Sequence, residues 1–317
     1  MRGRSLPAMR RVLVVLVVVA AACSSPAAET TTSAATSSTS TSAPVTTAPA
    51  TTSAADTTTT AVEPVETILY DHWKGSFTYG EGLRIDVHAP DDRSNHPIAI
   101  TIHGGGWFGG RLDSMGHLAD GLAARGFVVF NATYRTIANG GTFPDTVEDV
   151  ACAVAYARAH ALDYSTSADH FTLIGYSAGA HLSSLVAFAP GVFGGACDEA
   201  DIPVDAFVGL AGSYDTDIYA FLLQPFFGTA FATDPEPWKA GNPYTYVDRI
   251  GDDVDLLFIH GEADEVVPTS MSEDLYLAVD RAGATAGLRI VSGAGHGEVN
   301  SPRVVGDLIA EFVAADQ

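Results

Sequence analysis

The sequence predicts an α/β fold in which a mostly parallel β-sheet is covered by helices on both faces. Short apolar runs, such as Ile98–Ile102, Phe127–Asn131 and Leu256–His260, alternate with segments of helical periodicity. Strands with such continuous apolar runs are typical of parallel sheets that are buried on both faces. The chain has 317 residues, of which 47% are hydrophobic, so it is long enough to bury a sizeable core.

The charge of the chain excludes some classes of partner. Asp and Glu number 38 against 16 Lys and Arg, for a formal charge of −22, and four of the basic residues lie within the first eleven positions. A body this acidic repels phosphate backbones, and it offers no polybasic patch for anionic lipids. We therefore predict no nucleic-acid partner. The three cysteines have no zinc-type spacing, and we predict neither a metal nor a cofactor.

The first 23 residues predict a signal peptide of the lipoprotein type. A basic start is followed by the apolar run Val12–Ala22, which is shorter than the roughly 20 residues that span a bilayer. Small residues then precede Cys23, which resembles a bacterial lipoprotein signal and predicts lipidation of that cysteine. We expect an exported protein anchored to the outer face of the cell membrane. The alternative is ordinary cleavage nearby and a secreted protein.

Residues 24–65 predict a disordered linker ahead of a folded domain at residues 66–317. Twenty of the 31 residues from 30 to 60 are Thr or Ser, and most of the others are Ala or Pro. Such a segment cannot bury enough apolar surface to offset the entropy of ordering its backbone. The linker would hold the domain at a distance from the membrane.

The first elements of the domain follow from their hydrophobic periodicity. Leu83–His88 alternates and predicts a strand in an antiparallel hairpin at one edge of the sheet. Ile98–Ile102 predicts a buried strand that leads into a glycine-rich loop. Leu118–Ala124 predicts a helix, and Phe127–Asn131 predicts the next strand. Pro144 begins a helix that extends to about His160, with apolar residues on one face.

The later elements repeat the alternation of strand and helix. Phe171–Ile174 predicts a strand that is followed by a helix of small residues, and Ala206–Leu210 and Leu256–His260 predict two more buried strands. Leu288–Val291 predicts the last strand, and Val304–Ala314 predicts a closing helix.

The segment Gly-Tyr-Ser-Ala-Gly predicts a nucleophile at Ser177. It lies between a predicted strand and a predicted helix, where a tight turn would expose the serine oxygen above the sheet edge. Gly175 and Gly179 remove side chains that would block this turn. Because a serine hydroxyl is a weak nucleophile, we expect a general base beside Ser177.

A second loop predicts an oxyanion hole. The segment His-Gly-Gly-Gly-Trp follows the strand Ile98–Ile102 and offers backbone N–H groups without side chains in the way. We expect the donors to be Gly105 and Gly106, together with the N–H of Ala178. His103, which opens this loop, is interpreted as a residue that braces it and not as the base.

The acid and the base follow the nucleophile in sequence. Asp264 lies in the loop after Leu256–His260, and His296 lies in a glycine-flanked loop after the last strand. His296 would accept the serine proton, and Asp264 would orient its imidazole. Glu262 and Glu265 are neighbouring carboxylates, so residue type alone does not decide in favour of Asp264.

From about Tyr79 to Val313 the chain resembles α/β-hydrolase carboxylesterases of the hormone-sensitive-lipase-like and feruloyl-esterase-like branch. The segments that carry this resemblance are HGGGW, NATYR, FPDTVEDV, GYSAGAHL, HGEADEVVP and GAGHG. The resemblance implies an eight-stranded sheet covered on both faces, a small cap and metal-free ester hydrolysis through an acyl-enzyme. It also implies the roles given above for Ser177, Asp264 and His296. Prolyl-peptidase relatives differ after the nucleophile, where this chain has Ala180.

An insert between about Phe221 and Tyr246 predicts a loop-rich cap beside the site. Aromatic residues of the insert and of the two motif loops are candidates to line a substrate pocket, although each could equally belong to the core. These are Trp107, Tyr176, Phe226, Phe227 and Trp238. From the modest cap we expect an open site and short acyl groups.

Cys152 and Cys197 are predicted to form a disulfide, because they lie in a domain that would fold in an oxidising space. Two separate thiols are the alternative.

Three functions fit these residues. The first is an esterase acting on small-molecule esters, the second is an amidase or formamidase on the same scaffold, and the third is a catalytically silent hydrolase fold used for binding. The complete set of Ser, Asp, His and glycine loop argues against the third. The sequence does not predict the oligomeric state.

Overall fold

The computed structural model describes residues 72–79, 82–194, 197, 203–251 and 253–316. All of them belong to Glu63–Gln317, which forms one compact unit. The predicted signal peptide, the linker and Cys23 lie outside the described residues. In the part of the chain that the structure describes, no helix is long and apolar enough to cross a membrane.

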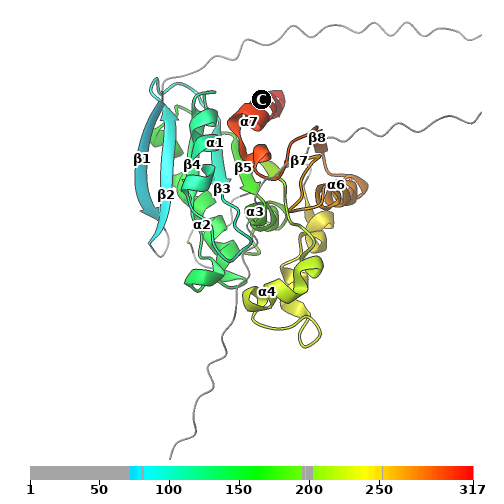
Figure 1. Ribbon diagram of the computed structural model, residues 1–317. Coiled ribbons are helices and arrows are strands. Elements are labelled where there is room, and N and C mark those ends of the chain that lie inside the picture. The colour runs from blue at the N-terminus through cyan, green and yellow to red at the C-terminus, as the bar shows by residue number, and fades with distance from the viewer. Residues whose placement is uncertain (1–71, 80–81, 195–196, 198–202, 252, 317) are drawn as a thin grey trace, which may run out of the picture. The chain divides into compact units, whose positions relative to one another are not determined.

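The described residues form an eight-stranded sheet with the order β1-β2-β4-β3-β5-β6-β7-β8. Strands β3 to β8 are parallel, whereas β2 is antiparallel to both β1 and β4. Figure 1 shows β1 and β2 at one edge and β7 and β8 at the other. The predicted parallel sheet with an antiparallel hairpin at one edge is confirmed. The strands are β1 (His72–Tyr79), β2 (Leu83–Pro90), β3 (Ile98–Ile102), β4 (Val128–Ala132), β5 (Phe171–Tyr176), β6 (Ala206–Leu210), β7 (Asp255–Gly261) and β8 (Ala286–Val291).

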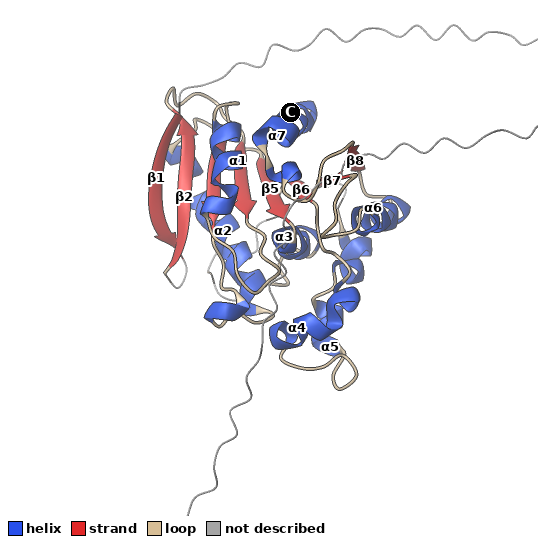
Figure 2. Ribbon diagram, viewed as in Figure 1, coloured by secondary structure: helices blue, strands red, loops and turns tan. Residues whose placement is uncertain are grey.

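Helices cover both faces of the sheet, as the apolar strands predict (Figure 2). α1 (Asp113–Ala123) and α7 (Pro302–Asp316) cover one face and share a core with alternate residues of the strands. α2 (Asp145–His160), α3 (Ala178–Phe188) and α6 (Ser270–Ala282) contribute to the core on the other face. Residues 98, 100 and 102 of β3 face the core that includes α2, α3 and α6, and Ala99 faces the core that includes α1 and α7. This period of two places every central strand between two layers of helix.

Two differences from the predicted elements have simple causes. α1 begins at Asp113 and not at Leu118, because its first turn carries an acidic residue and buries Met115 before the apolar stripe begins. The predicted loop-rich cap is largely helical. Its prolines suggested loops, but Pro235 and Pro237 lie at the start of a short helix, where a missing N–H is tolerated.

The insert consists of α4 (Ala220–Phe227) and α5 (Glu236–Ala240), with 3₁₀ turns at Thr216–Tyr219 and Pro243–Arg249. It is attached to the main body through the 3₁₀ turn beside α3 and through a hydrogen bond from the N–H of Phe143 to the carbonyl of Phe226 (2.8 Å).

Two motifs of the sequence meet in the body of the domain. The guanidinium of Arg135 binds both carboxylate oxygens of Asp149 at 2.8 and 2.9 Å, and its backbone N–H also donates to Asp149. This bidentate pair ties the loop after β4 to α2. Cys152 of α2 and Cys197 form a disulfide with their Cα atoms 5.6 Å apart, which is the pairing that the sequence suggests.

Candidate active site

Ser177 occupies a sharp turn between β5 and α3. Its backbone has φ 54° and ψ −120°, a conformation that non-glycine residues rarely adopt. The turn is held by hydrogen bonds from the N–H of Ser177 to the carbonyl of Leu210 (2.8 Å) and from Ala180 to the carbonyl of Ser177 (3.0 Å). Strain at a single residue of this kind is typical of a position whose side chain must be presented to a ligand.

The two glycines of the turn are required by space. A Cβ at Gly175 would lie 2.5 Å from the Cα of Ala180, and a Cβ at Gly179 would lie 2.4 Å from the carbonyl oxygen of His103. Both contacts are too short for any side chain. The sequence-based reason for these glycines is therefore confirmed, and α3 packs directly against the end of β3.

The side chains of Ser177, His296 and Asp264 form a hydrogen-bonded chain. Nε2 of His296 lies 3.1 Å from Oγ of Ser177, and Nδ1 of His296 lies 2.7 Å from Oδ2 of Asp264. Because a carboxylate only accepts, Nδ1 carries the hydrogen and Nε2 is free to accept the serine proton. The structure thus brings together three residues that are far apart in the sequence.

Asp264 is fully enclosed and fully hydrogen-bonded. Its Oδ1 accepts from the backbone N–H groups of Val266 and Val267, both at 2.8 Å, and its side chain has no exposed surface. Burial raises the pKa of this carboxyl, but the hydrogen bonds from Val267, His296 and Val266 outweigh burial and hold the pKa below its ordinary value. Asp264 is therefore an ionised acceptor for His296 at neutral pH.

A second histidine, His260, also contacts Asp264. Its Nε2 lies 3.0 Å from the carbonyl of Val267 and 3.2 Å from Oδ2 of Asp264, and its Nδ1 lies 2.8 Å from Oγ of Ser272. A carbonyl can only accept, so Nε2 carries the hydrogen and Nδ1 accepts from the serine hydroxyl. Burial lowers the pKa of His260, which keeps the ring neutral. Nothing in the sequence points to this contact except the position of His260 at the end of a buried strand.

The neighbouring carboxylates Glu262 and Glu265 make other contacts or none. Glu262 accepts from Oγ of Ser292 (2.6 Å) and from the N–H of Gly293 (3.0 Å), so it fixes the loop that leads to His296. Glu265 is exposed and does not contact His296. The geometry therefore decides the choice that residue type left open, in favour of Asp264.

The glycine loop lies directly opposite Ser177. Gly104, Gly105 and Gly106 line the same cleft as Ser177 and His296, and a Cβ at Gly104 would lie 2.9 Å from Cβ of Ser177. Gly105 and Gly106 have φ values of +131° and +61°, which favour glycine. Ala178 follows Ser177 as the first residue of α3 and is buried. Gly105 and Gly106 therefore line the same cleft as Ser177, and Ala178 is the next residue along the chain from Ser177.

His103 braces this loop, as the sequence suggests. Its Nδ1–H donates to the carbonyl of Gly104 (2.8 Å), and its ring stacks on Tyr134 with centroids 4.3 Å apart. The hydroxyl of Tyr134 donates to the backbone carbonyl of His103 (2.9 Å). Gly110 lies against the same ring, where a Cβ would be 2.3 Å from Nδ1.

Trp107 connects the glycine loop to α3 and to the insert. Its indole N–H donates to Nδ1 of His181 (3.1 Å), and Nε2–H of His181 donates to the carbonyl of Gly241 (2.7 Å). His181 is completely buried, and burial lowers its pKa to about 4, so it serves as a neutral bridge. Sequence reasoning missed this role, although His181 follows the nucleophile motif by four residues.

The cleft above Ser177 has a volume of about 620 Å³ and is lined mainly by apolar side chains. Trp107 and Tyr176 line it, as predicted, and the hydroxyl of Tyr176 donates to the backbone carbonyl of His296 (3.2 Å). Its other lining side chains, which sequence reasoning did not single out, are Phe108, Ser114, Ser213, Tyr219, Leu222, Val266 and Val267.

The three aromatic residues that the sequence assigned to the pocket from the insert are not in it. Phe226, Phe227 and Trp238 are buried and pack on one another, with the rings of Phe227 and Trp238 only 4.2 Å apart. They form the core of the insert, which is continuous with the core of the main body through contacts with Phe143. That prediction was wrong.

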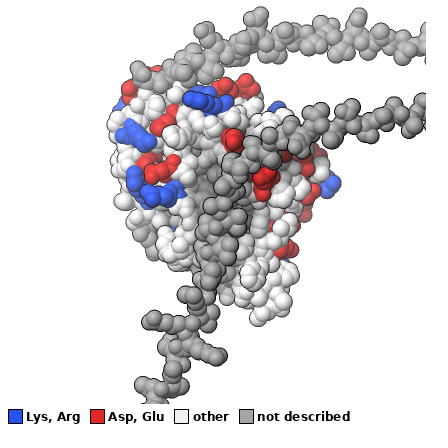
Figure 3. Space-filling view, in the orientation of Figure 1, with Lys and Arg blue, Asp and Glu red and all other residues white. Residues whose placement is uncertain are grey.

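The insert instead presents its exposed residues near the cleft. Leu222 lines the entrance, and the neighbouring Phe221 is 92% exposed. Figure 3 shows that the part of this face over α4 carries no Lys, Arg, Asp or Glu. Among the described residues, no group of three or more His, Cys, Asp or Glu could hold a metal ion.

Comparison with known proteins agrees with this geometry. The model of the BD-FAE family matches residues 85–279, which is more than half of the chain. The chain belongs to the BD-FAE family. Its sheet order and layers are those of the α/β-hydrolase fold, and its structural neighbours include esterases.

Named relatives of this BD-FAE protein are esterases. It is 30% identical over 210 residues to the probable carboxylic ester hydrolase LipM of Mycobacterium tuberculosis, covering 61% of this chain and 48% of LipM. It is 27% identical over 248 residues to the probable isoprenylcysteine alpha-carbonyl methylesterase ICMEL1 of Oryza sativa subsp. japonica, covering 70% of this chain and 56% of that protein. The chain spans about half the length of the curated relatives it matches.

Solved structures share the fold over most of the domain. A truncated carbohydrate esterase from gut microbiota has a TM-score of 0.68 and 25% identity, with 80% of this chain and 98% of the other covered. The esterase Est2 from Thermogutta terrifontis has a TM-score of 0.63 and 22% identity, with 76% and 91% covered.

Proposed function

We propose that this protein hydrolyses carboxylic esters of small molecules through an acyl-enzyme on Ser177. The observation that carries the proposal is the hydrogen-bonded chain from Ser177 to His296 to Asp264, which opens into an apolar cleft opposite a glycine loop. The names of the relatives support the same reaction class.

In the first half-reaction, Nε2 of His296 accepts the hydroxyl proton of Ser177 while Oγ attacks the carbonyl carbon of the ester. Asp264 keeps the imidazole in the required tautomer and stabilises the imidazolium that forms. The negative charge that develops on the carbonyl oxygen is stabilised by the N–H groups of Gly105, Gly106 and Ala178. His296 then returns the proton to the alcohol oxygen as the carbon–oxygen bond breaks.

In the second half-reaction, water enters the place that the alcohol has left. His296 removes a proton from this water as its oxygen attacks the acyl carbon, and the proton passes to Oγ of Ser177 as the acid departs. The buried network of Asp264 needs no rearrangement between the two steps, because all four of its hydrogen bonds come from rigid groups.

The cleft supports small or short acyl groups. Its volume of about 620 Å³ lies within the range of sites that enclose small ligands. Trp107 closes one side and is held in place by His181, while Phe108, Leu222 and Val266 leave the entrance open and apolar.

Hydrolysis of a chain-length series of p-nitrophenyl esters tests the proposal, with the matched p-nitroanilide and the variant Ser177→Ala beside them. Turnover that depends on Ser177 and is highest for short acyl chains supports the esterase. A preference for the anilide would favour the amidase alternative, which uses the same residues. The absence of turnover that depends on Ser177 would favour a binding role.

We also propose export and membrane anchoring through lipid on Cys23, supported by the apolar run and small residues before that cysteine. Expression in the presence of a radiolabelled fatty acid should label the protein, and the variant Cys23→Ser should be unlabelled and released from the membrane. Equal labelling of both proteins would contradict the anchor.

A further inference from the structure

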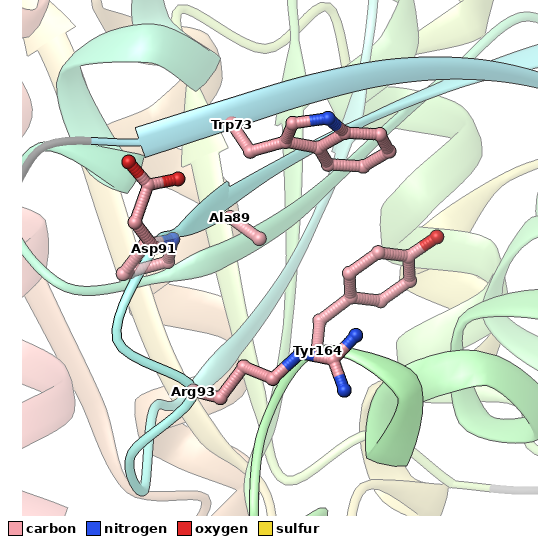
Figure 4. Close-up of a pocket in the computed structure, with 6 residues that line it drawn as sticks. Trp73, Ala89, Asp91, Arg93 and Tyr164 are labelled. Atoms are coloured by element: carbon pink, nitrogen blue, oxygen red, sulfur yellow. The ribbon is translucent and has the colours of Figure 1, made fainter.

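A second cleft lies at the end of the sheet where the parallel strands begin, opposite to the end that carries Ser177. β2 is antiparallel to β4, so its last residues lie where the parallel strands begin, whereas Ser177 lies where they end. The cleft there has a volume of about 310 Å³ and is shown in Figure 4. Its lining residues are Trp73, Ala89, Pro90, Asp91, Arg93 and Tyr164.

Two aromatic rings form one wall of this cleft. The ring centroids of Trp73 and Tyr164 are 5.8 Å apart, and their planes differ by only 19°. The indole lies flat across β1 because Gly75 has no side chain: a Cβ there would be 2.1 Å from Cη2 of Trp73. The small Ala89 is the cross-strand partner of Trp73. Trp73 is 45% exposed.

Two charged side chains complete the cleft. In Figure 4, Asp91, Arg93, Trp73 and Tyr164 surround Ala89. Asp91 and Arg93 are exposed, and neither forms an ion pair or a side-chain hydrogen bond within the part of the chain that the structure describes. The cleft therefore offers a carboxylate acceptor and a fork of N–H donors that no described side chain pairs with, beside two aromatic rings that stack on each other.

The loops that carry these side chains are fixed to one another. Asp92, between the two charged residues, accepts from the N–H of Ser94 (3.1 Å) and from Nε2 of His96 (2.5 Å). Ser165, next to Tyr164, accepts from the N–H of His96 (3.0 Å) and donates to its carbonyl (3.1 Å). His96 and Ser165 are buried. The cleft is thus a built feature and not a chance gap between mobile loops.

Arg93 itself is held in an unusual conformation. Its φ is +49°, in the left-handed region that favours glycine, and the hydrogen bonds of Asp92 keep it there. Strained residues of this kind gather where a side chain must be aimed at a ligand.

The chemistry of the cleft selects among ligands. Asp91 and Arg93 carry opposite charges, so an anion attracted by Arg93 would be repelled by Asp91, and a cation attracted by Asp91 would be repelled by Arg93. A neutral sugar ring is repelled by neither Asp91 nor Arg93. Its C–H face can lie on the flat aromatic rings, and its adjacent hydroxyls can donate to Asp91 and accept from Arg93. A volume of about 310 Å³ limits the site to roughly one or two sugar residues.

We propose that this cleft is a non-catalytic binding site for a neutral sugar residue of an oligosaccharide or polysaccharide chain. Its position at the far edge of the sheet separates it from ester hydrolysis, so the proposal does not depend on the function of Ser177. Bound there, a polysaccharide would be retained close to the domain.

Isothermal titration of the full chain carrying Ser177→Ala tests this site. The ligands are xylohexaose, mannohexaose and maltohexaose. We expect at least one of them to bind, with an association constant at least tenfold lower in Trp73→Ala and about threefold lower in Asp91→Asn and in Arg93→Met. Phe231→Ala is the matched control, because Phe231 is an equally exposed aromatic (44%) in the insert, and it should leave binding unchanged.

Three results would overturn the proposal. The first is no heat of binding with any of the three sugars. The second is binding that survives both Trp73→Ala and Arg93→Met. The third is capture of a proline-rich peptide in place of sugars, with dependence on Trp73, which would make the cleft a peptide site. Circular dichroism distinguishes a local effect of Trp73→Ala from unfolding, and the two exposed charged residues provide variants that leave the fold intact. A soluble hexasaccharide and insoluble polysaccharide of the same sugar, compared by pull-down, separate free oligosaccharide from polymer as the source.

Discussion

Polar side chains differ in their partners at the two ends of the parallel strands. These ends are the carboxyl edge, beside Ser177, and the amino edge, beside Trp73. At the carboxyl edge, Asp264 is enclosed, and His260, His296 and the backbone satisfy its carboxylate completely. At the amino edge, Asp91 and Arg93 are exposed and have no side-chain partner among the described residues.

This difference shows what each edge can do. A network whose members already satisfy one another can hold a proton acceptor in a fixed position, which is what a reaction at Ser177 requires. Side chains that lack protein partners can only be satisfied by solvent or by a ligand. The first edge therefore suits the proposed chemistry and the second the proposed binding, and we expect that each can be altered without the other.

The largest effect should come from Ser177→Ala. Loss of the nucleophile should lower kcat for p-nitrophenyl esters by about 10⁶-fold, the scale seen when such a residue is removed from a Ser-His-Asp site. Sugar binding at the amino edge should be unchanged. Steady-state kinetics and titration on the same preparation check both statements, and full activity in this variant would overturn the mechanism.

Asp264→Asn should have the next largest effect, about 10⁴-fold on kcat, because an amide cannot fix the required tautomer of His296. The matched controls are Glu262→Gln and Glu265→Gln, which lie two residues before Asp264 and one residue after it and do not contact His296. If either control were the more damaging change, the assignment of the acid would be wrong.

The pH dependence of stability should reflect buried His181, whose pKa of about 4 lies below that of an unfolded histidine near 6.5. Between these values the unfolded chain binds a proton that the folded protein does not. The free energy of unfolding should therefore be intact above pH 6.5 and should fall by roughly 3 kcal/mol as the pH is lowered to 4.

Urea unfolding at pH 7 and pH 4.5 measures this loss. The variant His181→Gln, which cannot take up a proton, should lose about 2 kcal/mol less than the native chain over this interval. An identical loss in both proteins would show that other groups are responsible.

The smallest effect should come from His260, which acts on the reaction only through Asp264. His260→Leu removes the donor to Oδ2 and should lower kcat about tenfold, with little change in KM. His260→Gln, whose amide can place a donor near the position of Nε2, should recover part of this loss. A merely structural role would instead lower the thermal stability of both variants and leave kcat per folded molecule unchanged.

Much of the fold could be predicted because the buried strands carry an unambiguous pattern. The glycines beside Ser177 and the order of Ser, Asp and His also placed most of the candidate site, since tight turns and loops after parallel strands leave clear signals. Asp264 could not be separated from Glu262 and Glu265 by residue type. Only the hydrogen bond to His296 does so.

Contacts between segments that lie far apart in the sequence were harder to predict. Phe226, Phe227 and Trp238 were assigned to the pocket because aromatic residues fill pockets and cores alike, and only the packing of the insert shows that they form its core. The roles of His181 and His260 could not be predicted, because their partners come from the insert and from the loop after β7.

The central claim is the acyl-enzyme, and trapping it is the most direct test. The protein would be mixed with p-nitrophenyl acetate, quenched in acid within the first turnovers, digested and analysed by mass spectrometry. We expect an acetyl group on the peptide that contains Ser177, longer-lived at low pH and absent from Ser177→Ala. Release of p-nitrophenol without any acetylated Ser177, or with the acetyl group on another residue, would contradict the account.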